Sequence, residues 1–199
     1  MAKAQTAGRK ASPASARKAA RGAKKPKAAK KPAANPLLAP WRGRFEMPPF
    51  KQIAPEQFRP AFEAALAEHE REVDKIAGAR VKPTFTNTVA AMENAGRALN
   101  RVARVFFNLT GAHTSPELQV IEREMAPKLA RHSTAIQLNA KLFERMDELY
   151  ERRGKLKLDA EQLRLIERYH KGFVRAGARL DARAKKRMGE INERLATLG

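Results

Sequence analysis

Apolar residues recur at spacings of three and four from Pro55 onward, which is the period of an amphipathic α-helix. The pattern predicts six helices and no strand. The first predicted helix runs from Pro55 to about Ala77, and the second runs from a cap at Thr86 or Asn87 to about Ala112. No internal repeat of fixed length links these helices, so a solenoid is not expected.

A third helix is predicted to begin at Ser115 and Pro116. Serine caps the first turn with its hydroxyl, and proline suits the first helical position because its φ angle is already helical. Pro127 lies inside this helix and lacks the N–H of the regular hydrogen-bond ladder. We therefore expect the helix to be kinked or divided near Ala126.

Polar residues with side-chain oxygens also mark the starts of the last three helices, because these oxygens accept hydrogen bonds from the first turn. The expected caps are Asn139 for a helix that stops before Gly154, Asp159 with Gln162 for the next, and Asp181 for the last. The predicted fold is therefore an all-α bundle of about six helices.

The segment 35–62 precedes and enters the first helix and is rich in aromatic residues and proline. It holds the only tryptophan, Trp41, and four of the nine phenylalanines of the chain. A bare linker rarely concentrates aromatic side chains. We expect an ordered extended segment whose aromatic rings are buried against the helices that follow.

Charge divides the chain into two parts. Residues 1–34 contain eleven of the 41 lysines and arginines and none of the 21 acidic residues, and the net charge of the whole chain is +20. A basic, proline-containing stretch with almost no apolar residues is predicted to be disordered. The expected organisation is a disordered tail over 1–34 and one helical domain over 35–199. The tail either binds nucleic acid weakly through its charge or is a solubilising extension.

Composition excludes several classes of protein. The chain has no cysteine, which excludes disulfides and thiolate metal sites. Residues 1–35 contain no Leu, Ile, Val or Phe, so they cannot form the apolar core of a secretory signal. No apolar stretch approaches the roughly 18 residues that span a bilayer. We expect a cytoplasmic protein with no membrane partner.

The histidines do not predict a metal site. They number four, at positions 69, 113, 132 and 170, and are far apart in sequence. His69 and Glu70 match the first half of a His-Glu-x-x-His zinc motif, but Val73 occupies the position of the second histidine. We interpret the dipeptide as a chance match and each histidine as a partly buried polar position on a helix.

No catalytic, cofactor-binding or metal-binding residue is predicted anywhere in the chain. Ser115 is an expected cap, and Ser133 follows His132 but neighbours in a helix point to different sides. The acidic residues Glu117, Glu122 and Glu124 are interpreted as a solvated helix face. Glycine-rich phosphate loops are absent from the sequence.

Several short motifs nevertheless occur in an order that is typical of one enzyme family. They are 35–38 (Asn-Pro-Leu-Leu), 40–41 (Pro-Trp), 48–50 (Pro-Pro-Phe), 58–62 (Phe-Arg-Pro-Ala-Phe), 83–85 (Pro-Thr-Phe), 87–88 (Asn-Thr), 107–109 (Phe-Asn-Leu), 118–122 (Leu-Gln-Val-Ile-Glu), 127–132 (Pro-Lys-Leu-Ala-Arg-His), 142–143 (Leu-Phe), 149–150 (Leu-Tyr) and 173–178 (Phe-Val-Arg-Ala-Gly-Ala). In this order they resemble the N-terminal region of the thimet oligopeptidase family of zinc metallopeptidases, in its oligopeptidase A and peptidyl-dipeptidase branch. The resemblance covers residues 35–199.

The resemblance implies a larger helical peptidase fold divided by a deep channel, with the N-terminal helices forming one wall. In that family zinc is held downstream by His-Glu-x-x-His and a later Glu, and the channel admits short peptides. None of these catalytic residues has a counterpart here, and the basic tail is not part of the family pattern. We therefore expect a channel-wall part of an oligopeptidase that is inactive alone.

Two other interpretations remain open from the sequence. The helical domain could serve as a scaffold or binding module whose basic tail binds nucleic acid. It could also complement a separately encoded catalytic half. Peptide specificity and oligomeric state are not predicted by the sequence, and neither is the origin of the chain as a short gene product or a truncation.

Overall fold

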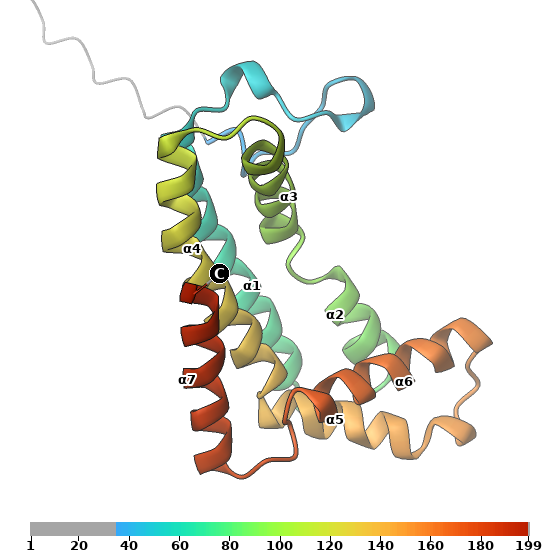
Figure 1. The fold of residues 1–199 in the computed structure, drawn as a ribbon. Helices are drawn as coiled ribbons and strands as arrows, with labels where there is room; N and C mark the ends of the chain where they lie inside the picture. The colour runs from blue at the N-terminus through green and yellow to red at the C-terminus, as the bar shows by residue number, and fades with distance from the viewer. Residues whose placement is uncertain (1–34, 199) are drawn as a thin grey trace, which may run out of the picture. The chain divides into compact units, whose positions relative to one another are not determined.

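The computed structural model describes residues 35–198, which form helices joined by short connections (Figure 1). Within this range there is no strand, so the all-α prediction is confirmed for it. The predicted disordered tail lies outside the described residues, and the predicted domain boundary stays a prediction. The α-helices are α1 (Phe58–Ala77), α2 (Ala91–Asn94), α3 (Arg97–Ala112), α4 (Pro116–Gln137), α5 (Ala140–Glu151), α6 (Ala160–Arg175) and α7 (Ala182–Leu198).

Shorter helical turns complete the described region. They are four 3₁₀ turns, η1 (Arg44–Glu46), η2 (Phe50–Gln52), η3 (Pro55–Gln57) and η5 (Arg153–Lys155), and one π-helical turn, η4 (Phe85–Ala90). The turn η3 leads directly into α1, so the first predicted helix begins as a 3₁₀ turn. None of the helices within residues 35–198 is both long and apolar enough to cross a membrane.

The predicted caps of the last four helices are confirmed. In each, the side-chain oxygen of the cap accepts a hydrogen bond from the backbone N–H three residues later, which satisfies a donor that the helix itself leaves free. The pairs are Ser115 with Leu118 at 3.3 Å, Asn139 with Leu142 at 3.0 Å, Asp159 with Gln162 at 2.8 Å and Asp181 with Ala184 at 2.7 Å.

The start of the second predicted helix was wrong by a few residues. Thr84 is the cap: its Oγ1 accepts from Asn87 N at 3.1 Å, while Asn87 Oδ1 accepts from Thr84 N at 2.9 Å. This reciprocal pair is a capping box with asparagine in the third position. The π-helical turn η4 follows and continues into α2.

The same predicted helix, expected to run without a break to about Ala112, is interrupted at Gly96. Gly96 has a φ of 71°, a left-handed conformation that favours glycine. Its N–H donates to Glu72 Oε2 at 2.7 Å, and a Cβ on Gly96 would lie 2.9 Å from Cε1 of His69. The break therefore lets the backbone approach α1 closely, and α2 and α3 are separate helices.

Pro127 does not divide α4, so the expected division was wrong, and the expected kink stays a prediction. The helix is continuous from Pro116 to Gln137 with Pro127 inside it. Buried residues lie on both sides of the proline, with Met125 before it and Thr134 after it. Packing of this face outweighs the one backbone hydrogen bond that proline removes.

Two hydrophobic clusters lie along α1. The first joins the N-terminal half of α1 to α3 and α4, and the second joins its C-terminal half to α5 and α6, which Figure 1 shows at the opposite end of α1 from the segment before it. Burying one large apolar side chain stabilises the fold by about 1.5–3 kcal/mol. The buried residues are Leu37, Phe58, Ala61, Phe62, Ala65, Val102, Val105, Phe106, Leu118, Ile121 and Met125 in the first cluster, and Val73, Ile76, Ala77, Val89, Leu142, Met146, Leu149, Ile166, Phe173 and Ala178 in the second.

The last helix, α7, packs along α4 (Figure 1). Asn192 Nδ2 donates to the buried Thr134 Oγ1 at 3.1 Å, which fixes the two helices at that point. Three apolar residues of α7, Ile191, Leu195 and Leu198, are exposed beside the face that packs on α4. This helix therefore contributes little buried apolar surface to the described fold.

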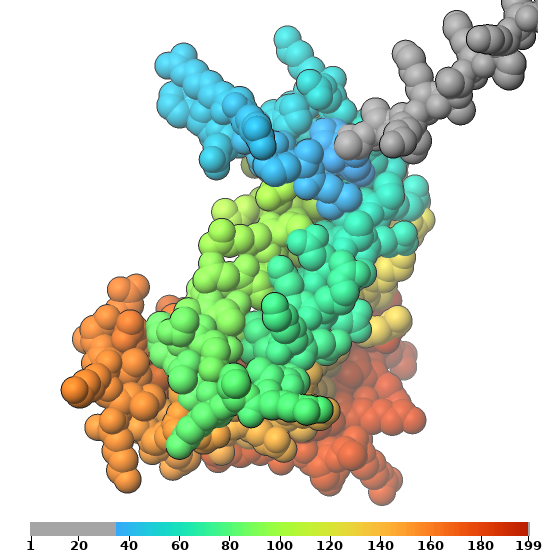
Figure 2. All heavy atoms as spheres, turned by 180° about the vertical axis from the view of Figure 1, so that it is seen from behind, coloured from blue at the N-terminus to red at the C-terminus, as the bar shows by residue number. Residues whose placement is uncertain are grey.

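The aromatic residues of segment 35–62 are only partly buried. Phe58 and Phe62 are buried in the first cluster and Trp41 packs against it, as expected. Phe45 and Phe50 are 79% and 45% exposed, so the prediction was wrong for these two. The reason is that the stretch between Trp41 and Ile53 extends beyond α1 and α3, and in the space-filling view it projects from that end (Figure 2).

Candidate functional site

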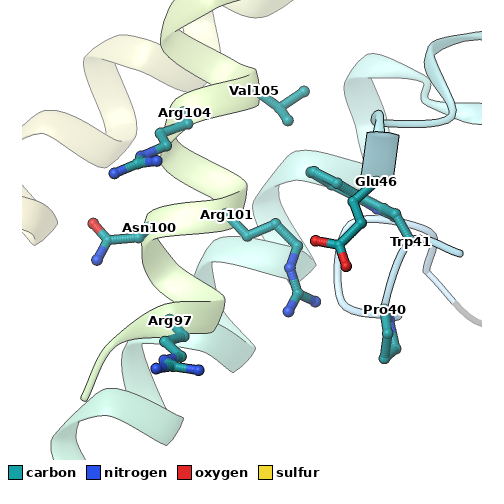
Figure 3. Close-up of a pocket in the computed structure, with 8 residues that line it drawn as sticks. All are labelled: Pro40, Trp41, Glu46, Arg97, Asn100, Arg101, Arg104 and Val105. Atoms are coloured by element: carbon teal, nitrogen blue, oxygen red, sulfur yellow. The ribbon is translucent and has the colours of Figure 1, made fainter. Parts of the chain in front are cut away.

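A pocket of about 540 Å³ lies between the segment before α1 and the exposed face of α3 (Figure 3). Its volume falls within the range of about 300–1,000 Å³ that is usual for small-ligand sites. The lining residues are Pro40, Trp41, Glu46, Arg97, Asn100, Arg101, Arg104 and Val105.

The sequence of α3 explains why three arginines line one pocket. Arg97, Arg101 and Arg104 are spaced by four and three residues, so they lie on one side of the helix. Val102 and Phe106 lie on the buried side and belong to the first hydrophobic cluster. Burial of that side turns the arginine-bearing side outward, toward the pocket.

Arg101 is held in place by the segment that packs against it. Its Nη1 donates to the carbonyl oxygens of Leu38 and Ala39, both at 3.2 Å, and its guanidinium carbon lies 5.7 Å from the centre of the Trp41 ring. The indole N–H of Trp41 in turn donates to the carbonyl of Pro36 at 2.8 Å. The guanidinium therefore has a fixed position, and Figure 3 shows it pointing toward Trp41 and Glu46.

The pocket carries an excess of positive charge. Its lining includes three arginines but only one carboxylate, that of the exposed Glu46, and of the three arginines Arg101 reaches nearest to it (Figure 3). Glu46 takes part in none of the ion pairs formed within residues 35–198, and Arg97 donates to the neutral side chain of Asn94. A planar anion is the ligand that such a site favours, because a guanidinium can bind two of its oxygens together.

Two of the four histidines meet, although they are far apart in sequence. His69 Nδ1 lies 3.0 Å from His132 Nε2, so one imidazole donates to the other. Burial lowers the pKa of both rings below the ordinary value of 6.5, and the neighbouring imidazole lowers the pKa of His132 further. Both rings are therefore neutral at pH 7.

The other two histidines lie apart from this pair. His170 is buried on α6, where its Nε2 lies 2.8 Å from Asp147 Oδ1 and its ring stacks on Tyr150 at a centroid distance of 3.8 Å. His113 is exposed and lies immediately after the end of α3. The expectation that it occupies a partly buried position on a helix was therefore wrong. Within residues 35–198 no group of three or more His, Asp or Glu side chains is placed to hold a metal ion.

The remaining side chains considered from the sequence have structural contacts. Ser115 caps α4, and Ser133 Oγ accepts from Gln137 Nε2 at 3.3 Å, while His132 points to His69. Glu124 pairs with Arg59 at 2.5 Å, and this ion pair lowers the pKa of the carboxyl group. The pocket on α3 was missed, although the spacing of its arginines is visible in the sequence.

Comparison with known proteins gives matches to peptidases. The chain is 40% identical over 164 residues to dipeptidyl carboxypeptidase of Escherichia coli (strain K12), and equally so to that of Salmonella typhimurium (strain LT2). It is 28% identical over 165 residues to oligopeptidase A of Escherichia coli. These alignments cover 82–83% of this chain. No family model matches the chain.

The chain spans about a quarter of the length of these relatives, since each alignment covers 24% of the relative. The matched part of the chain is all-helical in the structure, and the relatives that it matches are peptidases. These peptidases support the resemblance to the thimet oligopeptidase family, and the chain is similar to a part of them. The family resemblance seen in the sequence motifs is confirmed.

Proposed function

We propose that residues 35–198 form part of the wall of the peptide channel in a zinc oligopeptidase, and that the 199-residue chain does not hydrolyse peptides by itself. One observation carries the proposal: the chain is 40% identical to a quarter of dipeptidyl carboxypeptidase, and its sequence contains no His-Glu-x-x-His motif. The expected cytoplasmic location stays a prediction.

The family's zinc chemistry does not fit the residues that the structure describes. The nearest match, His69 followed by Glu70, directs its imidazole to His132 rather than to a set of ligands. Zinc in a catalytic site needs three protein ligands with one open position. Residues 35–198 offer no group of that size.

Exposed apolar side chains support a role as part of a larger assembly of helices. Phe45 and Met47 are exposed in the segment before α1, and Leu195 and Leu198 are exposed on α7. The two leucines of α7 are three residues apart and so lie side by side, and apolar surface formed in this way is often covered by another part of the protein or by a partner. We propose a catalytic peptidase region as the part that covers α7.

The proposal predicts that the purified 199-residue chain, supplied with Zn²⁺, will not cleave a fluorescence-quenched oligopeptide. The physical reason is that the chain lacks the second histidine of the zinc motif and therefore cannot activate water in the way the family does. The measurement is the rate of fluorescence increase, with dipeptidyl carboxypeptidase of Escherichia coli as the positive control. Turnover that requires zinc, stops on chelation and co-purifies with the chain would overturn the proposal.

A further inference from the structure

The pocket between Trp41 and α3 has no role in the function proposed so far. It combines an apolar side, formed by Pro40, Trp41 and Val105, with a cationic side formed by the arginines of α3. Ligands that match such a pocket carry an anionic group next to an apolar one. The proposed function makes short peptides the first class of ligand to consider.

We propose that this pocket binds a carboxylate of a short peptide, with Arg101 as the main anion-binding residue. This inference rests on the proposed function and names how the channel-wall region would hold its ligand. The ligand's neighbouring side chain would lie against Trp41 and Pro40. Arg97 and Arg104 would add positive potential at the edge of the pocket.

The geometry of Arg101 suits a carboxylate. Its hydrogen bonds within residues 35–198 use Nη1 alone, to the carbonyls of Leu38 and Ala39, which leaves the edge formed by Nε and Nη2 for a ligand. Two parallel N–H donors on one edge match the two oxygens of a carboxylate. Because the guanidinium is already fixed against Trp41, little conformational entropy is lost when an anion binds.

Single-stranded nucleic acid fits this pocket less well. Sites for it place several aromatic rings along a basic groove, so that successive bases can stack. This pocket contains one aromatic ring, and Arg101 already lies over that ring at 5.7 Å. A single guanidinium that binds one anionic group, next to one apolar surface, is the arrangement expected for the carboxylate at the end or on a side chain of a peptide.

Glu46 allows a test in which a substitution should strengthen ligand binding rather than weaken it. Its carboxylate lines the pocket and opposes an incoming anion, without an ion pair within the described region to hold it. Glu46 is exposed and belongs to neither hydrophobic cluster, so removing its charge should leave the fold intact. Replacement by glutamine should therefore strengthen the binding of an anion.

Trp41 reports directly on the pocket because it is the only tryptophan of the chain. The experiment titrates the full 199-residue chain with acetyl-Ala-Ala-Leu bearing a free carboxylate and follows tryptophan emission, with calorimetry on the same samples. We expect saturable binding, and at least tenfold weaker binding of the same peptide with a C-terminal amide. Acetyl-Ala-Glu-Leu amide carries its carboxylate on a side chain only. Its binding shows whether the pocket accepts a side-chain carboxylate as well as a C-terminal one, and either result supports the inference.

Three variants separate the pocket from the rest of the surface. Arg101→Gln should weaken binding of the free peptide by about tenfold or more, and Glu46→Gln should strengthen it about twofold to threefold. Arg123→Gln is the matched control, because Arg123 is exposed on α4 and does not line the pocket. If Arg101→Gln disturbs the packing of Trp41, its weaker binding could have a structural cause. The stronger binding expected for Glu46→Gln then tests the inference by itself.

Several outcomes would overturn the inference. They are equal binding of the free and amidated peptides, binding absent by both methods, weaker binding by Glu46→Gln, and tighter binding of oligothymidylate or inorganic phosphate than of the peptide. Any of them would leave the peptidase proposal standing, because that proposal is tested by zinc-dependent turnover. In the same way, turnover by the chain would overturn the peptidase proposal without changing the peptide affinities measured for the pocket.

Discussion

Replacing Arg145 by leucine should lower the free energy of unfolding by about 2–4 kcal/mol. Arg145 lies on α5 and is only 7% exposed. Its Nη1 donates to the carbonyls of Ala79 at 2.8 Å and Val81 at 3.0 Å. Leucine fills much of the same space but donates no hydrogen bond, so these carbonyls lose their partner.

The same side chain also binds the middle of η4. Arg145 Nη2 donates to Asn87 Oδ1 at 3.0 Å and to Thr88 Oγ1 at 3.2 Å. One guanidinium therefore connects α5 to both the loop after α1 and the turn that follows it. Hydrogen bonds from a charged donor contribute more than neutral ones, about 1.5–3 kcal/mol each before the cost of burying the charge.

Urea unfolding measures this effect, with Arg123→Leu as the control. Arg123 is exposed on α4, and its replacement should change stability by no more than about 0.5 kcal/mol. A loss below about 1 kcal/mol for Arg145→Leu would show that the buried arginine does not hold the loop and η4 in place.

Phe106→Ala should destabilise the fold by about 3–5 kcal/mol, which is the usual cost of removing a fully buried aromatic ring. Phe106 has no exposed surface and lies at the centre of the first hydrophobic cluster. Its ring meets Phe58 and Phe62 edge-on, with centroids at 5.0 and 5.2 Å. Alanine would leave a cavity between α1 and α3.

The neighbouring residue provides a matched control for this substitution. Phe107 is on the same helix but is 45% exposed, so Phe107→Ala should cost less than about 1 kcal/mol. Both variants change helix propensity equally, and the difference between them isolates burial. Equal losses in urea unfolding would contradict the assigned packing of α3 against α1.

Local signals in the sequence predicted the helix starts well. A cap joins residues three apart, so Asn139, Asp159 and Asp181 could be recognised without knowledge of the fold. The break at Gly96 could not, because it depends on Glu72, which lies 24 residues earlier on α1. Apolar spacing alone is compatible with a continuous helix at that point.

Contacts between distant residues also explain what was missed in the candidate site. The basic spacing of α3 is visible in the sequence, but the pocket exists only because Trp41, 60 residues before Arg101, packs against that helix. The pairing of His69 with His132 has the same origin, since the two are 63 residues apart. Phe45 was expected to be buried but is exposed, because composition alone does not distinguish a buried aromatic residue from an exposed one.

The resemblance to this family could be seen in the sequence although no single motif is diagnostic. Short motifs in a constant order pointed to the thimet oligopeptidases, and the 40% identity to dipeptidyl carboxypeptidase agrees with them. The isolated pair His69-Glu70 carried no such information. In the structure its histidine pairs with His132.

A hybrid enzyme tests the central claim most directly. In it, residues 35–199 replace the matching quarter of dipeptidyl carboxypeptidase of Escherichia coli, and the measured quantity is kcat/KM for a quenched oligopeptide, with zinc content and circular dichroism as checks of folding. If this region forms the channel wall of a peptidase, the hybrid should cleave the peptide with kcat/KM reduced by no more than about a hundredfold. A folded, zinc-loaded hybrid that does not cleave would contradict the account.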